Sequence, residues 1–580
     1  MHKRVLLIGL LVMVAATATA RVPASAGLPP SLPQAVASGD TTQTTSVLWA
    51  RSTAAGAVTF EYGTDATFAT LTGVVSATVT NTLVPAKMQV SGLMPNTDYF
   101  YRVTDAAGGT ATGRLHTAAA RGTRAGLRFG VSGDWRGELS PYPAVANADE
   151  RDLDFFVELG DTIYADYASP VLPGVTSATT LDEYRLKHTE VYSTRLGLNT
   201  LGDLRAATSV LAVIDDHEVL NDFAGGAPSS SDARFPSGFD FINDTPRYEN
   251  GLQAFQEYNP LRDEVYGATG DPRTANERKL YRANTYGNDA AVFVLDARSF
   301  RDTELPGITD PSDQGQISAY LTATFAISRT MLGQQQLADV QQDLLRADRA
   351  GIVWKFVLVP EPIQNLGVLA ASDRFEGYAA ERTKLLKFIH ENDIRNVVFV
   401  AADIHGTIVN NLTYQEAVGG QQIATKSFEI TTGSVAFEKP FGPTVVDIAR
   451  NAGLISAGQY AFYLSLSRNN KDLFMKQAIN DQLDDFGYSP IGLEDGLVNE
   501  TLVAGTYFSA HVYGWTEFDI NPTSGQLRIT TYGINWYGEA DLASNPNGVI
   551  NRPIEVVSEF TVTPETVVQR MDVYLPLIVR

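Results

Sequence analysis

The hydrophobic pattern of the 580-residue chain changes twice along its length. Residues 30–118 hold short β-branched and aromatic runs, such as TSVLWARST and AVTFEYGT, between Gly, Asn, Asp and Pro turns, which predicts an all-β unit. From residue 126, apolar runs that end in polar clusters alternate with amphipathic stretches such as ERTKLLKFIHEND, which predicts strands alternating with helices. The C-terminal third returns to strand-like runs. We therefore expect a small all-β domain ahead of an α/β domain.

The stretch LMPNTDYFYRV (93–103) makes the first prediction more specific. A turn that leads into a tyrosine-rich strand resembles the corner of immunoglobulin and fibronectin III-like sandwiches, where a tyrosine hydroxyl bonds back to the chain. We predict a small sandwich of this type over residues 30–118. It carries no candidate catalytic group, so we expect it to be dispensable for chemistry.

The N-terminus has the pattern of a secretory signal peptide. His2, Lys3 and Arg4 precede an apolar stretch, Val5 to Ala20, and small-residue cleavage sites follow at 18–20 or 24–26. A membrane anchor is the alternative, but the most apolar part is short for a span. We expect a soluble mature protein that is secreted, periplasmic or at the cell surface, with no transmembrane segment. The expected divisions are a signal peptide at 1–26, the sandwich at 30–118, the α/β domain at 125–563 and a C-terminal tail at 564–580.

Charge and cysteine content exclude several classes of function. The net charge of −22 argues against nucleic-acid binding, because duplex affinity depends largely on phosphate neutralisation by Lys and Arg. The chain has no cysteine, which excludes disulfides, thiolate nucleophiles and iron–sulfur clusters. We expect no nucleic-acid-binding module, and a monomer.

Carboxylates and histidines gather where the predicted α/β strands end, the edge at which such folds bind ligands. They are Asp134 in SGDWRG, Asp161 and Tyr164 in GDTIY, Asp216, His217 and Glu218 in DDHE, and Asp403 and His405 in ADIH. Taken singly, such an Asp more often caps a turn or helix, and a lone His is usually structural. Two of the seven histidines fall in these motifs, however, and burying unpaired carboxylates costs several kcal/mol. Oxygen ligands with imidazole and phenolate suit iron, manganese, calcium or zinc, so we expect a pair of metal ions as the counter-charge.

The order of these motifs resembles the calcineurin-like metallophosphatases, and specifically the alkaline phosphatase D family. That family carries Gly-Asp-x-x-Tyr, Asp-Asp-His-Glu followed by Asn, and Gly-Asp-x-His. Longer stretches resemble it too, among them AFQEYNPLR (254–262) and LYRANTYGNDAAVFVLDARSFRD (280–302). The resemblance covers residues 30 to about 440. It implies a four-layer α/β metallophosphatase, in which a β-sandwich is flanked by helices, preceded by an immunoglobulin or fibronectin III-like domain.

Three positions depart from the family pattern. A Cys often stands where this chain has Asp134, which restores the ligand usual in the wider superfamily. The superfamily's Asp-x-His is DWR here, so Arg136 cannot be a ligand and Tyr164 can fill the gap. The sequence AADIH lacks the usual Gly before Asp403.

The resemblance implies the following ligands. The first metal site would comprise Asp134, Asp161, Tyr164 and His405. The second would comprise Asp161 as the bridge, Asp216 and Asp403, with a further ligand from WKFVLVPEPIQN, for which Glu361 is the candidate and Gln364 or Asn365 are alternatives. The implied pair is iron(III) and calcium, with zinc or manganese possible.

We assign His217 as the catalytic group that protonates or steadies the leaving oxygen, with Glu218 or Asp215 orienting its ring. A histidine that caps a turn is the alternative. Arg136 is expected to bind a phosphate oxygen, or else to form a surface salt bridge. Arg298 and Arg301 are interpreted as structural, paired with local acids. The other histidines, His116, His188, His390 and His511, are assigned to the core or surface.

The sequence thus predicts an exported two-metal enzyme that hydrolyses small phosphomonoesters, phosphodiesters or both through attack of a metal-bound hydroxide. One alternative is a phospholipase-type phosphodiesterase that acts on lipid head groups, which needs an apolar lip around the same metals. Another is a catalytically dead cell-surface binding protein, against which the intact set of site residues argues.

Overall fold

The computed structural model describes residues 28–310, 313–367, 371–451 and 453–567. The expected signal peptide and most of the expected tail lie outside these residues. Among the helices in the described ranges, none has the length and apolar character needed to cross a membrane.

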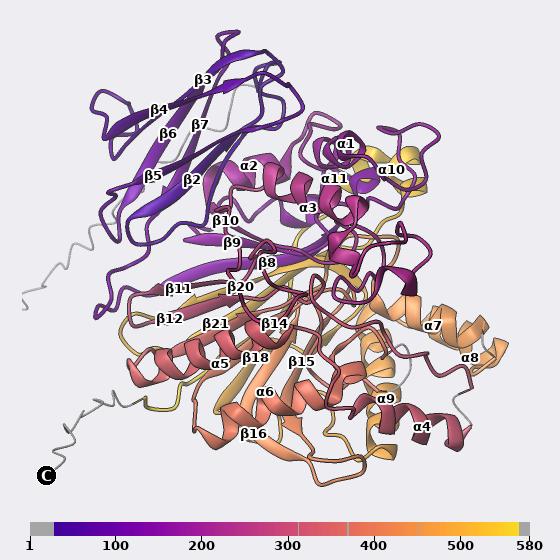
Figure 1. The fold of residues 1–580 in the computed structure, drawn as a ribbon. Helices are drawn as coiled ribbons and strands as arrows, with labels where there is room; N and C mark the ends of the chain where they lie inside the picture. The colour runs from indigo at the N-terminus through magenta and orange to yellow at the C-terminus, as the bar shows by residue number, and fades with distance from the viewer. Residues whose placement is uncertain (1–27, 311–312, 368–370, 452, 568–580) are drawn as a thin grey trace, which may run out of the picture.

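The N-terminal unit is built from two facing sheets (Figure 1). One contains β1 (Val36–Gly39), β2 (Thr45–Ala50) and β5 (Ala86–Ser91); the other has the order β4 (Gly73–Val79), β3 (Gly56–Gly63), β6 (Asp98–Thr104), β7 (Thr110–His116). Leu48, Phe60 and Tyr101 pack between them. At the corner predicted from the sequence, the backbone N–H of Met94 donates to the hydroxyl of Tyr99 at 3.0 Å. The all-β prediction is confirmed for these residues, and the immunoglobulin-like assignment stays a prediction.

Two larger sheets stack face to face behind this unit. The first runs β18 (Glu500–Gly505), β22 (Glu555–Val562), β21 (Leu527–Asn535), β20 (Val512–Ile520), β8 (Leu127–Trp135), β9 (Phe155–Leu159), β10 (Ser209–Val213), with β17 (Ser434–Ala436) beside β8. The second runs β11 (Arg282–Tyr286), β12 (Ala290–Val294), β13 (Trp354–Leu358), β14 (Val397–Ala401), β16 (Ile423–Thr431), β15 (Thr407–Tyr414), β19 (Phe508–Ser509). Strands β8, β9 and β10 are parallel, as are β12, β13, β14 and β16.

Helices cover the outer faces of both sheets. Strand β9 (FFVEL) illustrates the layering: Phe155 and Val157 face the core between the sheets, whereas Phe156 faces the helices. A strand buried on both sides is expected to be mostly apolar, and the exception here, Glu158, lies 3.5 Å from the Arg205 guanidinium. The first sheet is covered by α1 (Leu181–Val191), α2 (Thr200–Ala207) and α3 (Pro246–Tyr258), and the second by α5 (Gln334–Arg349) and α6 (Ala379–Glu391). The expected order of helix, sheet, sheet and helix is therefore present.

The remaining helices lie around this core. They are α4 (Gln314–Thr324), α7 (Phe441–Asn451), α8 (Ala457–Ser465), α9 (Arg468–Asp485), α10 (Glu539–Ser544) and α11 (Pro546–Ile550). Figure 1 shows α7 and α8 projecting from the side opposite the N-terminal unit.

The N-terminal unit shares a sheet with the α/β part. Strand β1 pairs in parallel with β10, through Ser38 with Ser209 and Gly39 with Val210. The backbone around β1 packs so closely against the α/β part that a Cβ on Gly39 would lie 2.4 Å from the carbonyl oxygen of Pro260. The linker near residue 120 therefore separates two packing units, but one hydrogen-bonded sheet runs through both.

Candidate metal centre

The ends of four strands bring the predicted site residues together. Asp134 is the penultimate residue of β8, Asp161 follows β9, Asp216 follows β10, and His405 follows β14. The two sheets meet at this point, because His405 Nε2 lies 3.6 Å from the Asp134 carboxylate. The loops after β9 and β10 are also joined, since the N–H of His217 donates to Asp161 at 3.2 Å.

The backbone of these loops is strained at the candidate ligands themselves. Asp134, Asp161, Asp403 and His405 have φ values of 63°, 50°, 63° and 58°. Non-glycine residues adopt this left-handed region infrequently, although Asp and His do so more readily than most, and twelve other non-glycine residues of the described chain share it. Gly160 before Asp161 has φ 81°, and a Cβ there would lie 2.6 Å from the Cβ of Asp215. The glycine of the Gly-Asp motif thus lets the two acidic loops approach.

The first predicted ligand set contains buried oxygen atoms that could bind a metal and that lack a hydrogen-bond partner. Both carboxylate oxygens of Asp134 are buried without a hydrogen bond, and the Tyr164 hydroxyl is buried without one of ordinary geometry. Burial and the neighbouring carboxylates raise the pKa of Asp134, of Asp161 and of Tyr164 well above their usual ranges. Burial lowers the pKa of His405 to about 3, which keeps its imidazole neutral and able to bind a metal. These residues fit a cation of the kind that the sequence implies.

The second predicted set is arranged around an arginine. Arg298 is fully buried and pairs with Asp215 and Glu361, and with Asp373 at 2.9 Å. The same guanidinium lies 3.8 Å from Asp216 and 3.8 Å from Asp403. Arg301 pairs with Asp373 at 2.6 Å. The prediction that both arginines pair with local acids is confirmed, but the metals are no longer the sole candidate counter-charge.

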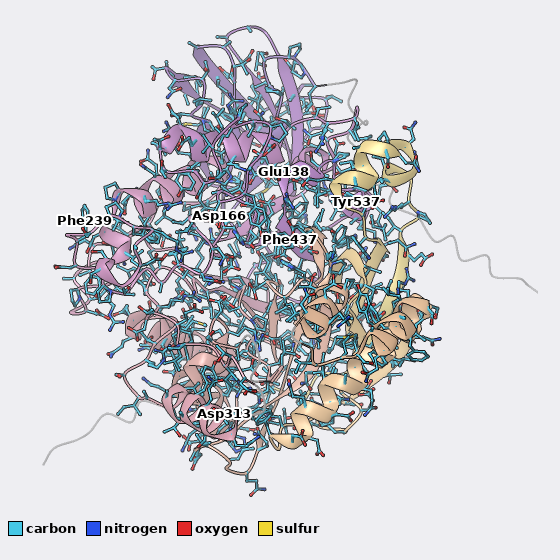
Figure 2. The ribbon with its side chains drawn as sticks, turned by 90° about the vertical axis from the view of Figure 1, so that its right-hand side faces the viewer. Glu138, Asp166, Phe239, Asp313, Phe437 and Tyr537 are labelled. Atoms are coloured by element: carbon cyan, nitrogen blue, oxygen red, sulfur yellow. The ribbon has the colours of Figure 1, made fainter. Side chains whose placement is uncertain are left out.

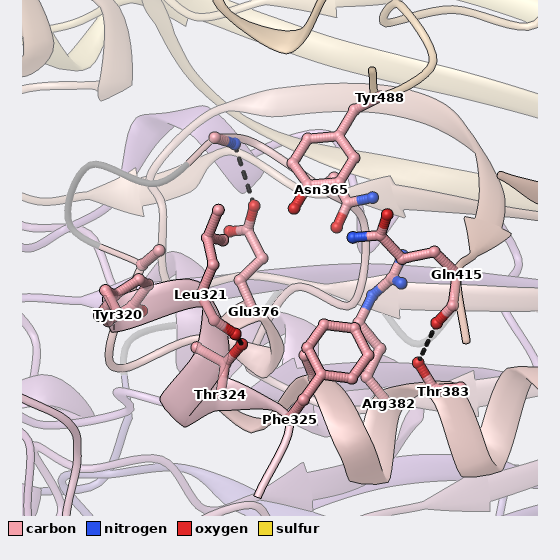
Figure 3. A pocket seen from close by; sticks show the side chains of 13 residues that line it. Tyr320, Leu321, Thr324, Phe325, Asn365, Glu376, Arg382, Thr383, Gln415 and Tyr488 are labelled. Carbon is pink, nitrogen blue, oxygen red and sulfur yellow. Dashed lines mark hydrogen bonds between the residues drawn. The ribbon is translucent and has the colours of Figure 1, made fainter. Parts of the chain in front are cut away.

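Glu361 and its two alternatives have different surroundings. One oxygen of Glu361 faces Arg298, and the other is buried without a hydrogen bond, so one oxygen is free to bind a cation. Glu361 also lies within metal-binding distance of Asp215 and Asp403. Gln364 donates its amide to the carbonyl of Ile408 at 3.2 Å. Asn365 lines a small cavity with Glu376, Arg382 and Tyr488 but with none of the acids around Arg298 (Figure 3). The geometry favours Glu361 over Asn365.

The ring of His217 is held by a residue that the sequence did not identify. Its Nδ1 lies 2.6 Å from Asp166, whose other oxygen accepts the N–H of Asn221 at 3.0 Å. The expectation that Glu218 or Asp215 orients the ring is wrong. Glu218 accepts the backbone N–H groups of Thr162 (2.7 Å) and Asp215 (2.9 Å), so it ties the two loops together.

The protonation of His217 follows from its neighbours. Burial alone would lower its pKa, but the carboxylates of Asp216 and Asp166 outweigh burial and raise the pKa to about 9. Its side chain also falls within metal-binding distance of Asp161 and Asp216. The ring can therefore serve as a proton donor or as a ligand, and the Asp166 bond leaves only Nε2 for either role.

Arg136 is surrounded by carboxylates and is not positioned as an open phosphate clamp. Its three nitrogens pair with Glu138 (3.3 Å), Glu438 (3.1 Å) and Glu539 (2.7 Å). Its guanidinium lies 4.9 Å from the ring centre of Tyr167. This geometry favours the salt-bridge alternative.

An aromatic side chain that the sequence did not single out closes one side of the centre. Phe437 stacks on Tyr164 with 4.8 Å between ring centroids, and its ring lies 4.2 Å from the His405 ring at a tilt of 34°. Figure 2 shows Phe437, Asp166 and Glu138 near one another on this side of the molecule. Among the remaining histidines, the described contacts are structural: His116 pairs with Asp98, His188 stacks on Tyr258, His390 lies near Tyr414 and His511 bonds Asp472.

Comparisons with known proteins match both the N-terminal unit and the part of the chain that carries the acidic centre. The model of the PhoD-like phosphatase family matches residues 131–475, and that of the family's N-terminal domain matches residues 16–119. Alkaline phosphatase D of Bacillus subtilis (strain 168) is 26% identical over 378 residues, which are 61% of this chain and 59% of that protein. A solved structure of PhoD covers 93% of this chain and 91% of its own, with a TM-score of 0.64 at 21% identity, and so has the same fold. Since the family models account for both the N-terminal unit and the part that carries the acidic centre, this chain belongs to the PhoD-like phosphatase family.

Proposed function

We propose that this protein is a metal-dependent phosphohydrolase that acts on phosphomonoesters, phosphodiesters or both. The proposal rests on two buried groups that could bind a metal and that lack a hydrogen-bond partner, the Asp134 carboxylate and the Tyr164 hydroxyl. Both belong to the predicted ligand set that includes the neutral ring of His405, which lies 3.6 Å from Asp134. Groups of this kind carry an uncompensated desolvation cost, which a bound cation would offset. The family membership gives the reaction class.

The chain's residues divide into two sets of ligands. Asp134, Asp161, Tyr164 and His405 would hold one cation, which we propose to be iron(III). Asp161, Asp216 and Asp403, with the free oxygen of Glu361, would hold a second, which we propose to be calcium; zinc and manganese suit the same donors. When bound, the cations supply Lewis-acid stabilisation of the charge that develops on the phosphoryl oxygens.

The chain's own contribution to turnover is the Asp166–His217 pair. Protonated His217 can donate from Nε2 to the leaving oxygen, while the bond from Nδ1–H to Asp166 fixes the ring. Arg298 acts at a distance from the substrate, because it is fully buried; it holds Asp215 and Asp373 in place.

Two expectations from the sequence belong to this proposal as well. Export depends on residues 1–26, which lie outside the described ranges. A lipid phosphodiester is the second candidate substrate, and the partly exposed Phe437 and Tyr167 beside the centre favour it, since an apolar lip suits a lipid. The dead-enzyme alternative is disfavoured by the complete set of candidate ligands.

Metal removal with elemental analysis tests the proposal. Chelation should abolish hydrolysis of an aryl phosphate and of its diester analogue, and reloading with the cation found by mass spectrometry should restore it. Asp134→Ala should lose metal and activity, whereas Asp203→Ala, a carboxylate of α2 outside the centre, should lose neither. Full turnover by a metal-free preparation would refute the metal-dependent function.

A further inference from the structure

A cavity of about 680 Å³ opens between the two stacked sheets, at the end away from the candidate metal centre. Trp354, the first residue of β13, and Val397, the first residue of β14, line this cavity. Glu361 and Asp403, which belong to the metal centre, follow the other ends of the same two strands. The cavity is therefore separate from the metal centre, and its volume lies within the range of about 300–1,000 Å³ that is usual for ligand pockets.

The floor of this cavity is apolar, whereas its mouth is polar. Trp354, Phe428 and Val562 line the floor, and they belong to the buried core between the sheets. Val498 packs against the same core but stays partly exposed. The mouth carries polar and charged side chains, among them Arg395, Lys426, Glu494 and Asn499. An apolar floor with a polar rim suits an occupant that is itself mostly apolar.

The chain itself runs along the mouth of the cavity just before the last described range ends. The N–H of Glu565 donates to the side chain of Asn396 at 2.8 Å, and Asn396 donates to the carbonyl of Glu565 at 2.9 Å. Arg395 donates to the carbonyl of Thr566 at 2.5 Å. The described residues stop one position later, and each residue spans at most about 3.6 Å. Residues 568–580 therefore start at the mouth of the cavity.

Residues 568–580 have a sequence that suits this cavity. The segment, VQRMDVYLPLIVR, is mostly apolar, and it would expose that surface to water if nothing covered it. Pro576 disfavours a helix, so Leu575 and Leu577 are expected on the same side of an extended segment. The segment carries two arginines and one aspartate, whereas four carboxylates and two permanent cations line the cavity. The net charges of the segment and of the cavity are therefore opposite.

We propose that this cavity is a binding site for the chain's own residues 568–580. A tethered segment needs only a weak intrinsic affinity, because a short linker holds it at an effective concentration on the order of millimolar. At about 1 mM, a segment whose free peptide has a dissociation constant of about 0.1 mM would be bound about nine-tenths of the time. A second copy of the chain gains no such advantage. Docking there would leave the metal centre open, since the two sites lie at opposite ends of β13 and β14.

Thiol labelling of the full chain tests the proposal, because the chain has no cysteine of its own. Val498→Cys and, in a second variant, Ala424→Cys each place a single thiol at the cavity, where residues 568–580 should shield it from a maleimide. Adding Leu575→Ser/Leu577→Ser should speed labelling roughly tenfold, because removing two apolar side chains weakens docking. A synthetic peptide of residues 568–580, added at about 1 mM, should slow labelling of that serine variant again.

The matched control is Val74→Ser/Met94→Ser, which replaces two exposed apolar side chains of the N-terminal unit and should leave the labelling rate unchanged. Equal labelling rates with and without Leu575→Ser/Leu577→Ser would overturn the proposal, as would a peptide that gives no protection. Protection that is lost on dilution, together with elution as a dimer, would assign the cavity to the same segment of a second copy and so overturn the intramolecular docking.

Discussion

Replacing Asp166 with Asn would separate the role of the His217 ring from that of the metals. The substitution keeps the size of the side chain and an oxygen that can accept from Nδ1–H, but it removes the negative charge. Asp166 belongs to neither predicted ligand set, and its second oxygen bonds the backbone of Asn221. Metal content should therefore stay as in the wild type.

The magnitude follows from the geometry of the bond. At 2.6 Å, the contact between Asp166 and His217 Nδ1 is a short, charge-assisted hydrogen bond. Such bonds contribute about 1.5–3 kcal/mol, against about 0.5–1.5 kcal/mol for neutral ones. Asp166→Asn exchanges the first kind of bond for the second, and a loss of about 1.4 kcal/mol corresponds to a tenfold lower rate. His217→Asn removes proton donation entirely, which is typically worth about a hundred- to ten-thousand-fold.

The assay compares kcat on an alkyl phosphate and on an aryl phosphate, with metal content measured in the same samples. An aryl leaving group needs little proton donation, so both variants should lose more on the alkyl substrate. Asp98→Asn is the matched control, because Asp98 forms a similar pair with His116 at 2.8 Å in the N-terminal unit. Equal losses on both substrates would refute the proton-donor assignment, and loss of metal from His217→Asn would make His217 a ligand.

Three further changes test other parts of the structure. If Tyr164 binds iron(III), Tyr164→Phe should bleach a visible absorption band, and an iron-loaded wild type without such a band would contradict the assignment. A fragment of residues 125–580 should be less stable than the full chain, because it exposes the edge of β10, and a monomeric fragment with an unchanged melting temperature would contradict this. The same fragment should still bind metal and hydrolyse an aryl phosphate if the sandwich is dispensable for chemistry. Burial lowers the pKa of His188 to about 3, so the folded state resists a proton that the unfolded state binds below about pH 6.5. The free energy of unfolding should therefore be independent of this histidine well above pH 6.5 and should fall by about 2 kcal/mol between pH 7 and pH 5. In denaturant unfolding, His188→Leu should lose less stability than the wild type over this pH range, and an equal loss would exclude the burial argument.

The sequence predicted the strands and their layers well because burial leaves a direct record in residue type. A mostly apolar run such as FFVEL indicates a strand that is buried on both faces, and the Gly-Asp that follows it marks the strand end. The same reasoning found the candidate ligands, since carboxylates at the ends of parallel strands converge at one edge.

Other contacts could not be predicted, because they depend on how loops return in three dimensions. Asp166 lies five residues after Asp161, and nothing in that spacing shows that its carboxylate meets His217. The pairing of β1 with β10 joins strands that are far apart in sequence, and an apolar run does not reveal which edge it will pair with. The left-handed conformations of Asp134 and His405 leave no trace in composition either, because Asp and His are common in ordinary loops.

Arg298 shows how far one buried cation can compensate a cluster of acids. Burial tends to raise the pKa of every carboxylate there, but for Asp373 the guanidinia of Arg298 and Arg301 outweigh it and lower the pKa. Asp216 is lowered in the same way by Arg298 and His217. Asp134 and Asp161, which have no arginine partner, keep strongly raised pKa values, but so do Glu361 and Asp403 beside Arg298. One buried arginine therefore does not compensate the whole cluster, because acids of both predicted ligand sets keep raised pKa values, and the need for a cation extends over both sets.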